Sequence, residues 1–428
     1  MDIGAIILLT TFVVLLLMNV PIAVCLGMSS VITFLVTGMS FNALPVNYFA
    51  ANCKFVLLAI PFFILAGNIM EKAQISNKLI DFARTFVGHR QGGMSLVCVI
   101  VACFFAAISG SGPATVAALG MIIIPAMIDT GYAASSASAL MATAGAIGVI
   151  IPPSISFVLY GSITNISVGK LFMAGIIPGI MMGIALVLAM KFAARGRKLK
   201  TLPKATKEER LAAFKSAIWA LLMPVIILGG IYGGVFTPTE AAAVACVYGL
   251  LVGVFVYRTV RFKEFIRILV DSGRQTAVVM FIVCASSIFG YLVTINGVAA
   301  TAGEFLTTVS GGNKIVFLLI VNIILLIVGC FLDGNSAFYI FTPILYPVAM
   351  KLGIDGVAFG VMMVMNLAIG MVTPPVGVNL YVACGMGNVS IKEICKGVVP
   401  FIVASLITLL LITYFPIFCT FLPNLMQG

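Results

Sequence analysis

The sequence predicts an all-α integral membrane protein made of two inverted repeats, each with a re-entrant hairpin and a broken helix. Three observations predict this fold class: the composition, an internal repeat, and the distribution of basic residues. Of the 428 residues, 62% are hydrophobic and 9% are charged, with a mean hydropathy of +1.22. Soluble domains carry roughly 45–50% apolar and about 25% charged residues, so a soluble chain of this composition would lack a polar surface.

The repeat appears when the sequence is compared with itself at an offset of 222 positions. Residues 109–178 then match residues 331–400, and the prolines and glycines coincide: Pro125 with Pro347, Gly148 with Gly370, Pro178 with Pro400, and Pro152-Pro153 with Pro374-Pro375. Each double proline lies inside a long apolar run. Proline removes a main-chain donor and clashes with the preceding turn, so both runs are predicted to be broken helices. Interrupted membrane helices at corresponding positions of two repeats indicate a transporter's binding site.

Apolar runs bounded by turn residues predict the elements of each repeat. The first repeat, 1–192, has spans at 3–18, 21–37, 55–71 and 171–192, an amphipathic helix at 76–87, a hairpin at 94–128 and a broken helix at 135–163. A basic connector, 193–215, leads to the second repeat, 216–428. This repeat has spans at 216–235, 239–257, 274–294 and 397–422, a short helix at 298–309, a hairpin at 314–350 and a broken helix at 357–385.

The hairpins are predicted to be re-entrant because their helices are short. A helix of about 15 residues rises only ~22 Å, less than the ~30 Å hydrocarbon core. Each repeat then crosses the membrane five times, and an odd number inverts the second repeat relative to the first.

The basic residues predict the orientation. With the connector in the cytoplasm and both termini outside, 20 of the 24 Lys and Arg lie on the cytoplasmic side, and only Lys54, Lys170, Lys314 and Lys351 lie outside. This bias is typical of the positive-inside rule. The net charge of +11 is therefore an orientation signal with anionic lipid headgroups as its partner, and does not indicate nucleic-acid binding.

Local signals define two further features. Thr237-Pro238-Thr239-Glu240 predicts a capping box at a helix start. Asp333 is a candidate either to hold a cation or to cap the helix beginning near Asn335, and the cap is favoured slightly. With so few carboxylates in apolar segments, Na⁺ coupling is favoured over a proton relay.

Enzymatic chemistry is not predicted. The apolar segments contain no His, and neither Ser109 nor Ser111 has a base beside it in the sequence, as a nucleophile would need. The chain has no metal-ligand cluster, Walker loop or GxGxxG motif after a strand, so ATP-driven transport by this chain is not expected either.

The hairpin tips and the helix breaks form two candidate sites. The first pairs residues 109–115 with 148–154, and the second pairs 333–336 with 370–377. A helix break frees carbonyl groups, which suit Na⁺, and amide groups at helix N-termini, which suit an anion. A single proline kink or a single Gly-Ser-Gly is more often a bend or a close helix contact. The coincidence of two hairpins and two breaks at one offset favours the paired sites.

Four motifs carry a resemblance to a known family: GSGPATVAALGMIIIPAM, GAIGVIIPPS, TPTEAAAVA and NLAIGMVTPPVGVNLYV. They resemble the large membrane subunit, of the DctM type, of the tripartite ATP-independent periplasmic (TRAP) transporters, which belongs to the ion transporter superfamily. The resemblance spans essentially the whole chain. It implies an elevator mechanism in the bacterial inner membrane, with a separate four-helix membrane subunit (DctQ type) and a periplasmic substrate-binding protein (DctP type) as partners. The implied substrate is an organic acid, such as a C4-dicarboxylate or a sialic acid.

The resemblance also implies which residues bind. A first Na⁺ would lie on carbonyl groups around Ser109, Gly148, Ile151 and Pro153, and a second around Gly329, Gly370, Thr373 and Val376. The substrate anion would lie between them, near Ser111, Ser154, Asn335 and Asn379. The predicted substrate-binding set is completed by neighbouring residues of the tips and breaks, namely Gly112, Thr115, Asp333, Ser336, Pro374, Pro375 and Gly377.

One residue departs from the family pattern. Pro113 stands where a small hydroxyl residue is expected, which removes a polar ligand from the first tip. Neither site contains an Arg to match a carboxylate. Two alternatives stay open beside a binding-protein-dependent Na⁺ symporter: a stand-alone ion-coupled anion carrier and a passive channel.

Overall fold

The computed structural model describes residues 3–332 and 334–426, and all regular secondary structure in this part is helical. The first half contains α1 (Ile3–Leu17), α2 (Ile22–Thr37), α3 (Ala43–Asn52), η1 (Phe55–Leu58), α4 (Ala59–Lys72), α5 (Ile75–Val87), α6 (Gly93–Ser109), α7 (Gly112–Asp129), α8 (Ala134–Ala146), η2 (Ile147–Val149), α9 (Ile155–Thr164) and α10 (Val168–Ala193). The second half contains α11 (Lys207–Tyr232), α12 (Pro238–Leu251), η3 (Val252–Val256), α13 (Phe262–Ile295), α14 (Val298–Ser310), α15 (Lys314–Gly329), α16 (Gly334–Lys351), α17 (Gly356–Gly370), α18 (Val378–Gly387), α19 (Ile391–Tyr414) and α20 (Ile417–Leu425).

The order of helices repeats along the chain. The second hairpin helices, α7 and α16, begin at residues 112 and 334, which are 222 positions apart. The helices of both halves are interrupted at the double prolines, between α8 and α9 and between α17 and α18, and both Pro-Pro bonds are cis. The all-α fold class with two hairpins and two broken helices is confirmed.

Four elements differ from the sequence-based prediction. The 34-residue α13 begins at Phe262, twelve residues before the predicted span, because its first turns carry charged residues that hide it in a hydropathy pattern. The predicted span 397–422 divides into α19 and α20 at Phe415-Pro416, where proline cannot continue the helix. The helix α3 was not predicted, since its apolar run is only 10 residues long. In addition, α11 begins at Lys207, inside the predicted connector.

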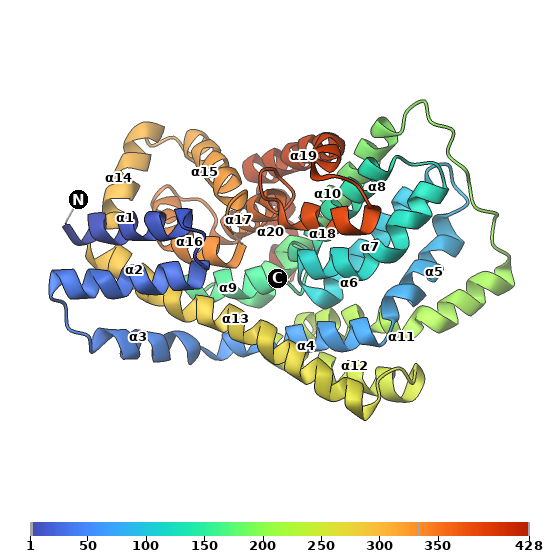
Figure 1. Cartoon of the computed structure of the whole chain (residues 1–428), viewed down its shortest axis with the longest axis horizontal. Coiled ribbons are helices and arrows are strands. Elements are labelled where there is room, and N and C mark those ends of the chain that lie inside the picture. The colour runs from blue at the N-terminus through green and yellow to red at the C-terminus, as the bar shows by residue number, and fades with distance from the viewer. Residues whose placement is uncertain (1–2, 333, 427–428) are drawn as a thin grey trace.

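Within each hairpin, the first helix starts and the second helix ends at the same end of the molecule. At the base of the α6–α7 hairpin, the connector passes the segment before α6 and the segment after α7. There Leu202 N donates to Gly88 O (3.3 Å) and Lys200 N donates to Thr130 O (2.9 Å). At the base of α15–α16, Lys314 Nζ donates to Gly353 O (3.3 Å). Figure 1 shows the two hairpins approaching the centre from opposite ends of the molecule. The hairpin helices are 16 to 18 residues long, and each differs by no more than two residues from its predicted length.

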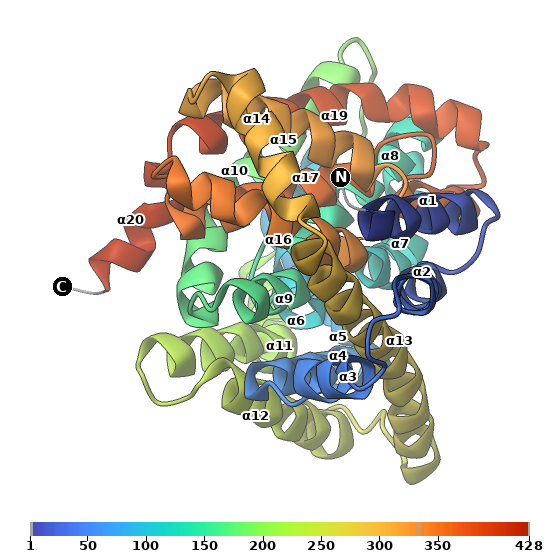
Figure 2. The ribbon, with the colours of Figure 1, turned by 90° about the vertical axis from the view of Figure 1, so that its left-hand side faces the viewer.

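The two halves exchange contacts around the centre. The second half of each broken helix packs on the hairpin of the other repeat: α18 on α7, and α9 on α16. The main hydrophobic core runs through both hairpins and both broken helices. A smaller core is separate and joins α1 and α2 to the end of α13, with Phe12, Phe34 and Phe289 at its centre. The helix α20 packs on α10 and contributes Cys419 to the main core, while its C-terminal end points away from the body of the molecule (Figure 2).

Seven helical segments in the described part are long and apolar enough to cross a membrane: Phe55–Lys72, Gly112–Asp129, Val168–Ala193, Lys207–Tyr232, Pro238–Val256, Phe262–Ile295 and Ile391–Tyr414. One of them is the hairpin helix α7, so length alone does not separate a hairpin helix from a full span. The re-entrant course of the hairpins therefore stays a prediction.

The predicted capping box at α12 is present. Glu240 N donates to Thr237 Oγ1 (3.3 Å), and Thr237 N donates to Glu240 Oε2 (2.8 Å). We expect Thr237→Ala to lower the free energy of unfolding by about 1 kcal/mol, the usual cost of losing an N-cap hydroxyl. Chemical denaturation in detergent measures this change. Thr308→Ala is the control, because that hydroxyl only donates to a carbonyl of its own helix, and an equal loss for both variants would contradict the capping role.

Candidate functional site

The first hairpin tip lies against the first helix break. Gly110 has a φ of +60°, and a Cβ built on it would lie 2.8 Å from the carbonyl oxygen of Pro153. A Cβ on Gly148 would lie 2.9 Å from Thr115 Oγ1 and 3.2 Å from Ser111 O. Only glycine permits these two approaches, so the sequence brings the tip into main-chain contact with the break.

Hydroxyl groups satisfy several of the main-chain carbonyls at this contact. Thr115 Oγ1 donates to Ser111 O (2.8 Å) and lies 2.9 Å from Ser109 Oγ. Ser154 Oγ donates to Val149 O (2.5 Å), a carbonyl that the break has freed from the α-helical pattern. The hydroxyls of Thr115 and Ser154 are therefore engaged in holding the backbone of the tip and the break.

The second tip and break make an even closer contact. A Cβ built on Gly370 would lie 2.5 Å from both the Cα and the carbonyl carbon of Gly329. Within the break, Thr373 Oγ1 donates to Ile369 O (2.7 Å). Asp333, a predicted site residue at this tip, lies outside the described residues.

Both tips and both breaks line a single cavity of about 230 Å³. The described residues that line it are uncharged: Gly110, Ser111, Gly112, Pro113, Val149, Ile155, Ser156, Gly329, Cys330, Phe331, Leu332, Gly334, Asn335, Leu367, Ala368, Met371, Val376, Gly377 and Val378.

Helix ends converge on this cavity. The first residues of α7, α9, α16 and α18 line it, as do residues at the ends of η2, α15 and α17. The N-caps of α7, α9 and α18 are Ser111, Ser154 and Gly377, and none of them caps its helix with a side-chain hydrogen bond. Helices elsewhere in the protein are of both kinds: α10 and α19 are capped by Ser167 and Ser390, whereas α8 and α14 have no side-chain cap. The cavity therefore receives amide groups with partial positive charge from several helices, together with carbonyl groups with partial negative charge.

The predicted site residues divide into two sets. Six line the cavity: Ser111, Gly112, Gly329, Asn335, Val376 and Gly377. The others lie in the tips and breaks without lining it: Ser109, Thr115, Gly148, Ile151, Pro153, Ser154, Ser336, Gly370, Thr373, Pro374, Pro375 and Asn379. The roles of both sets in binding Na⁺ and substrate stay predictions.

Asn379 joins the two repeats just behind the cavity wall. Its side chain is fully buried, and Nδ2 donates to Ala142 O of α8 at 3.0 Å. Its Oδ1 has no hydrogen-bond partner in the described part of the chain. A Cβ on Gly112 would lie 3.2 Å from Nδ2, so this amide touches the start of α7.

Sequence reasoning missed the apolar part of the cavity wall. Leu367, Ala368 and Met371 of the α17 end line it, and Val378 lines it from α18. These residues carry no polar group that marks a site. The one available signal is that Leu367 and Met371, which flank Gly370, are four residues apart, because residues at this spacing share a helix face.

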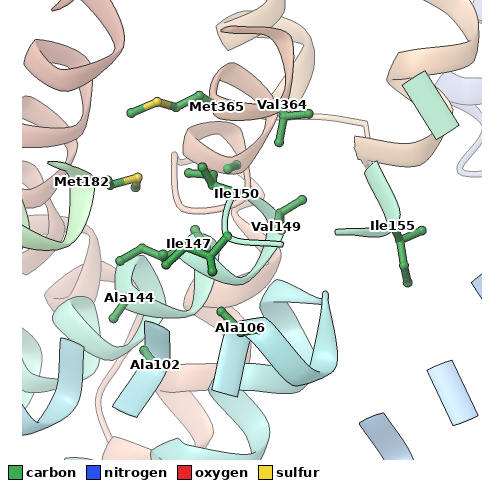
Figure 3. Close-up of a cluster of buried hydrophobic side chains, with 14 of the residues drawn as sticks. Ala102, Ala106, Ala144, Ile147, Val149, Ile150, Ile155, Met182, Val364 and Met365 are labelled. Atoms are coloured by element: carbon green, nitrogen blue, oxygen red, sulfur yellow. The ribbon is translucent and has the colours of Figure 1, made fainter. Parts of the chain in front are cut away.

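The two breaks differ in exposure. Residues 137–162, which include the whole first break, are all buried. Figure 3 shows Ile147, Val149 and Ile150 of this break among side chains of α6, α10 and α17: Ala102, Ala106, Met182, Val364 and Met365. In the second break, Val376 is 38% exposed and Val378 is 43% exposed. The cavity therefore reaches the surface beside the second break.

Comparisons with known proteins identify relatives over nearly the whole chain. A family model described as tripartite ATP-independent periplasmic transporter, DctM component, matches residues 9–418. A C4-dicarboxylate TRAP transporter large permease protein of Pseudomonas aeruginosa is 41% identical and covers 93% of both chains. A sialic acid TRAP transporter large permease protein of Vibrio cholerae is 39% identical over 90% of this chain and 92% of that protein. An isethionate TRAP transporter permease protein of Oleidesulfovibrio alaskensis is 44% identical over 95% of this chain, which spans 64% of that protein's length.

Two solved structures share the fold at low sequence identity. The YdaH transporter of Alcanivorax borkumensis matches with a TM-score of 0.63 at 14% identity, covering 96% of this chain and 98% of that one. The MtrF protein of Neisseria gonorrhoeae matches with a TM-score of 0.56 at 13% identity, covering 92% of this chain and 84% of that one.

Proposed function

Because the chain belongs to the DctM component family of the tripartite ATP-independent periplasmic transporters, we propose that it imports an organic acid together with Na⁺. As a large permease of this family it is a multi-pass membrane protein of the inner membrane. The proposed partners are a small membrane subunit of the DctQ type and a periplasmic binding protein of the DctP type. Both termini would lie on the periplasmic side.

The convergence of helix ends on one uncharged cavity carries the proposal. Helix N-termini with free amide groups bind carboxylates, and free carbonyl groups bind Na⁺. The described part of the chain has no cluster of three or more His, Cys, Asp or Glu side chains that could hold a metal ion. A cation here would therefore be held by main-chain carbonyls and hydroxyls, of which the Gly329–Gly370 contact is one source.

The uncharged described wall supports the proposed coupling to Na⁺. A carboxylate in such a cavity needs a counter-charge, because an isolated buried charge is costly. A bound Na⁺ supplies it, and the carboxylate in turn stabilises the Na⁺. Each ligand then raises the affinity for the other by the same factor, which is the thermodynamic basis of symport.

The size of the cavity favours a small substrate. Its volume of about 230 Å³ lies below the ~300–1,000 Å³ of sites that hold drug-sized ligands. A C4-dicarboxylate or a small sulfonate, the substrates named for two of the relatives, fits this volume better than a sialic acid. The movement we propose is an elevator, in which the mutually packed hairpins and broken helices move together against α1, α2 and α13.

Reconstitution tests this function. Proteoliposomes holding the large and small membrane subunits receive the binding protein and labelled succinate, isethionate or N-acetylneuraminate. We expect accumulation of one small acid only with an inward Na⁺ gradient and with the binding protein present. Uptake that is unchanged without the binding protein would instead establish the stand-alone carrier. Equilibration without accumulation would establish the channel.

A further inference from the structure

A second cavity lies between the last turns of α13 and the helix α16. Its volume is about 580 Å³, and it shares no lining residue with the cavity between the hairpin tips. It lies at the end of the molecule far from the basic connector, where α13 meets α14 (Figure 1). By the distribution of basic residues, this end faces the periplasm.

A positively charged side chain lines the second cavity, whereas the described residues that line the first cavity are uncharged. Lys54 is the one charged residue among the described residues that line it, and its side chain is exposed. Its Nζ donates to Ser162 O of α9 at 2.6 Å, which leaves two of its three N–H groups for other acceptors. The ammonium group is thus fixed at the cavity with free donor capacity.

Two buried hydroxyls point to a ligand at the same place. Ser286 of α13 and Thr342 of α16 both line the cavity and are 1% and 0% exposed. Neither hydroxyl oxygen has a hydrogen-bond partner in the described structure. Buried hydroxyls are normally bonded, so a ligand or ordered water is expected beside them. A cation together with hydroxyl donors suits a carboxylate.

One helix face connects this cavity with the hairpin tip. Asn335, Tyr339, Thr342 and Tyr346 of α16 are spaced by four, three and four residues, which places them on one face of the helix. Asn335 lines the tip cavity, and the other three line the second cavity. At 1.5 Å per residue the face spans about 16 Å. Polar side chains therefore mark one face of α16 from the second cavity to the first, with Tyr339 and Thr342 buried against neighbouring helices.

We propose that the second cavity is a staging site, where Lys54 and the adjacent hydroxyls hold the carboxylate of the organic acid before it moves along α16 to the hairpin tips. This inference rests on the proposed function. A site without charged side chains attracts an anion from water poorly, whereas a lysine at a cleft raises the local concentration of anions. The staging site thus supplies the positive charge that the described wall of the tip cavity does not.

Cysteine labelling tests the site without requiring transport. Thr294 lines the cavity and is exposed, so we place a thiol there as Thr294→Cys, in a Cys53→Ser background that removes the exposed thiol beside Lys54. We expect a thiol reagent that carries a sulfonate to react about three- to tenfold faster than a positively charged thiol reagent, because the Lys54 ammonium group attracts the first and repels the second. Lys54→Met should abolish this preference, and the transported acid should slow the reaction.

Thr301→Cys is the matched control. This threonine is also exposed, and like Thr294 it donates its hydroxyl to the carbonyl four residues earlier, but it lies on α14 outside the cavity. Its labelling should not depend on Lys54 or on the acid. Equal labelling of Thr294→Cys by both reagents, or labelling that no organic acid slows, would overturn the proposal.

Uptake kinetics give a second readout. Lys54→Met should raise the KM of uptake about tenfold with a smaller change in kcat. Lys54→Arg should have a KM close to that of the wild type, because arginine keeps the positive charge. If the wild type accumulates the acid and Lys54→Met has an unchanged KM, the staging site is wrong and the proposed function stands. If the wild type transports none of the acids, the proposed function fails, and labelling alone decides whether the cavity binds carboxylates.

Discussion

Sodium-dependent uptake should be lost when Gly370 is replaced by alanine, and also when it is replaced by valine. A Cβ at this position would overlap the Cα and the carbonyl carbon of Gly329, both 2.5 Å away. Main-chain atoms cannot rotate aside, so α15 and α17 must separate at the carbonyls predicted to hold the second cation. A displacement of about 1 Å in a binding constellation costs on the order of hundredfold in rate. Initial uptake rates in proteoliposomes measure the loss.

The control for this variant is Gly385→Ala. Gly385 also lies in a helix of the second repeat, but no atom outside its own helix lies within 4 Å of a Cβ built there. Gly148→Ala should be milder than Gly370→Ala, because its nearest obstacle is the Thr115 hydroxyl at 2.9 Å. Thermal unfolding with and without Na⁺ separates misfolding from lost cation binding. A folded Gly370→Ala protein that Na⁺ still stabilises and that transports normally would contradict the predicted second cation site.

Replacing Asn379 with leucine should reduce uptake by about five- to 150-fold. The change removes the hydrogen bond to Ala142 O and places an apolar group against the start of α7. Removing a buried hydrogen bond costs about 1–3 kcal/mol, and an equal loss in binding corresponds to roughly five- to 150-fold. The uptake rate per folded protein measures the effect.

Asn322→Leu is the matched control for Asn379→Leu. Asn322 is 2% exposed, and its amide donates to Thr413 Oγ1 at 3.2 Å, while its Oδ1 accepts from Asn366. It links α15, α17 and α19 and does not line the tip cavity. Both variants should lose similar stability, but only Asn379→Leu should lose transport from the folded fraction. Equal transport by the two folded variants would show that Asn379 only holds the helices together.

The features predicted from the sequence are those set by the backbone. Proline and glycine restrict or free the main chain wherever they occur, so Pro152-Pro153 and Pro374-Pro375 indicated the breaks without any knowledge of packing. The same holds for the Thr237 capping box, which depends only on residues near each other in sequence. The repeat then placed each tip and break at equivalent positions.

The features that could not be predicted depend on where side chains point. The hydroxyl of Ser154 donates to Val149 O across the break, and Ser154 does not line the cavity, which the sequence did not indicate; its predicted role in substrate binding stays a prediction. Leu367 and Met371 line the cavity, yet nothing in their chemistry distinguishes them from other apolar residues of α17. The start of α13 shows a related limit, because the charged residues of its first turns hide the helix in a hydropathy pattern. The end of α19 before Pro416 is marked in the sequence by the proline, which a hydropathy pattern does not register.

The difference between the two breaks was also invisible in the sequence. The double prolines are equivalent in the repeat, but the first break is buried among α6, α10 and α17, while the second is partly exposed beside the cavity. The second break, with Val376 and Val378, forms the exposed side of the tip cavity. The second cavity along α16 lies on the hairpin of the same repeat.

A density map of the protein with bound Na⁺ and transported acid would show whether both ligands bind between the hairpin tips. We expect the acid between Ser111 and Asn335, with its carboxylate at the first residues of the helices that begin there. We also expect cation density on the carbonyls beside Gly370. An empty tip cavity, with the acid and the cation bound at some other place in the protein, would contradict this expectation.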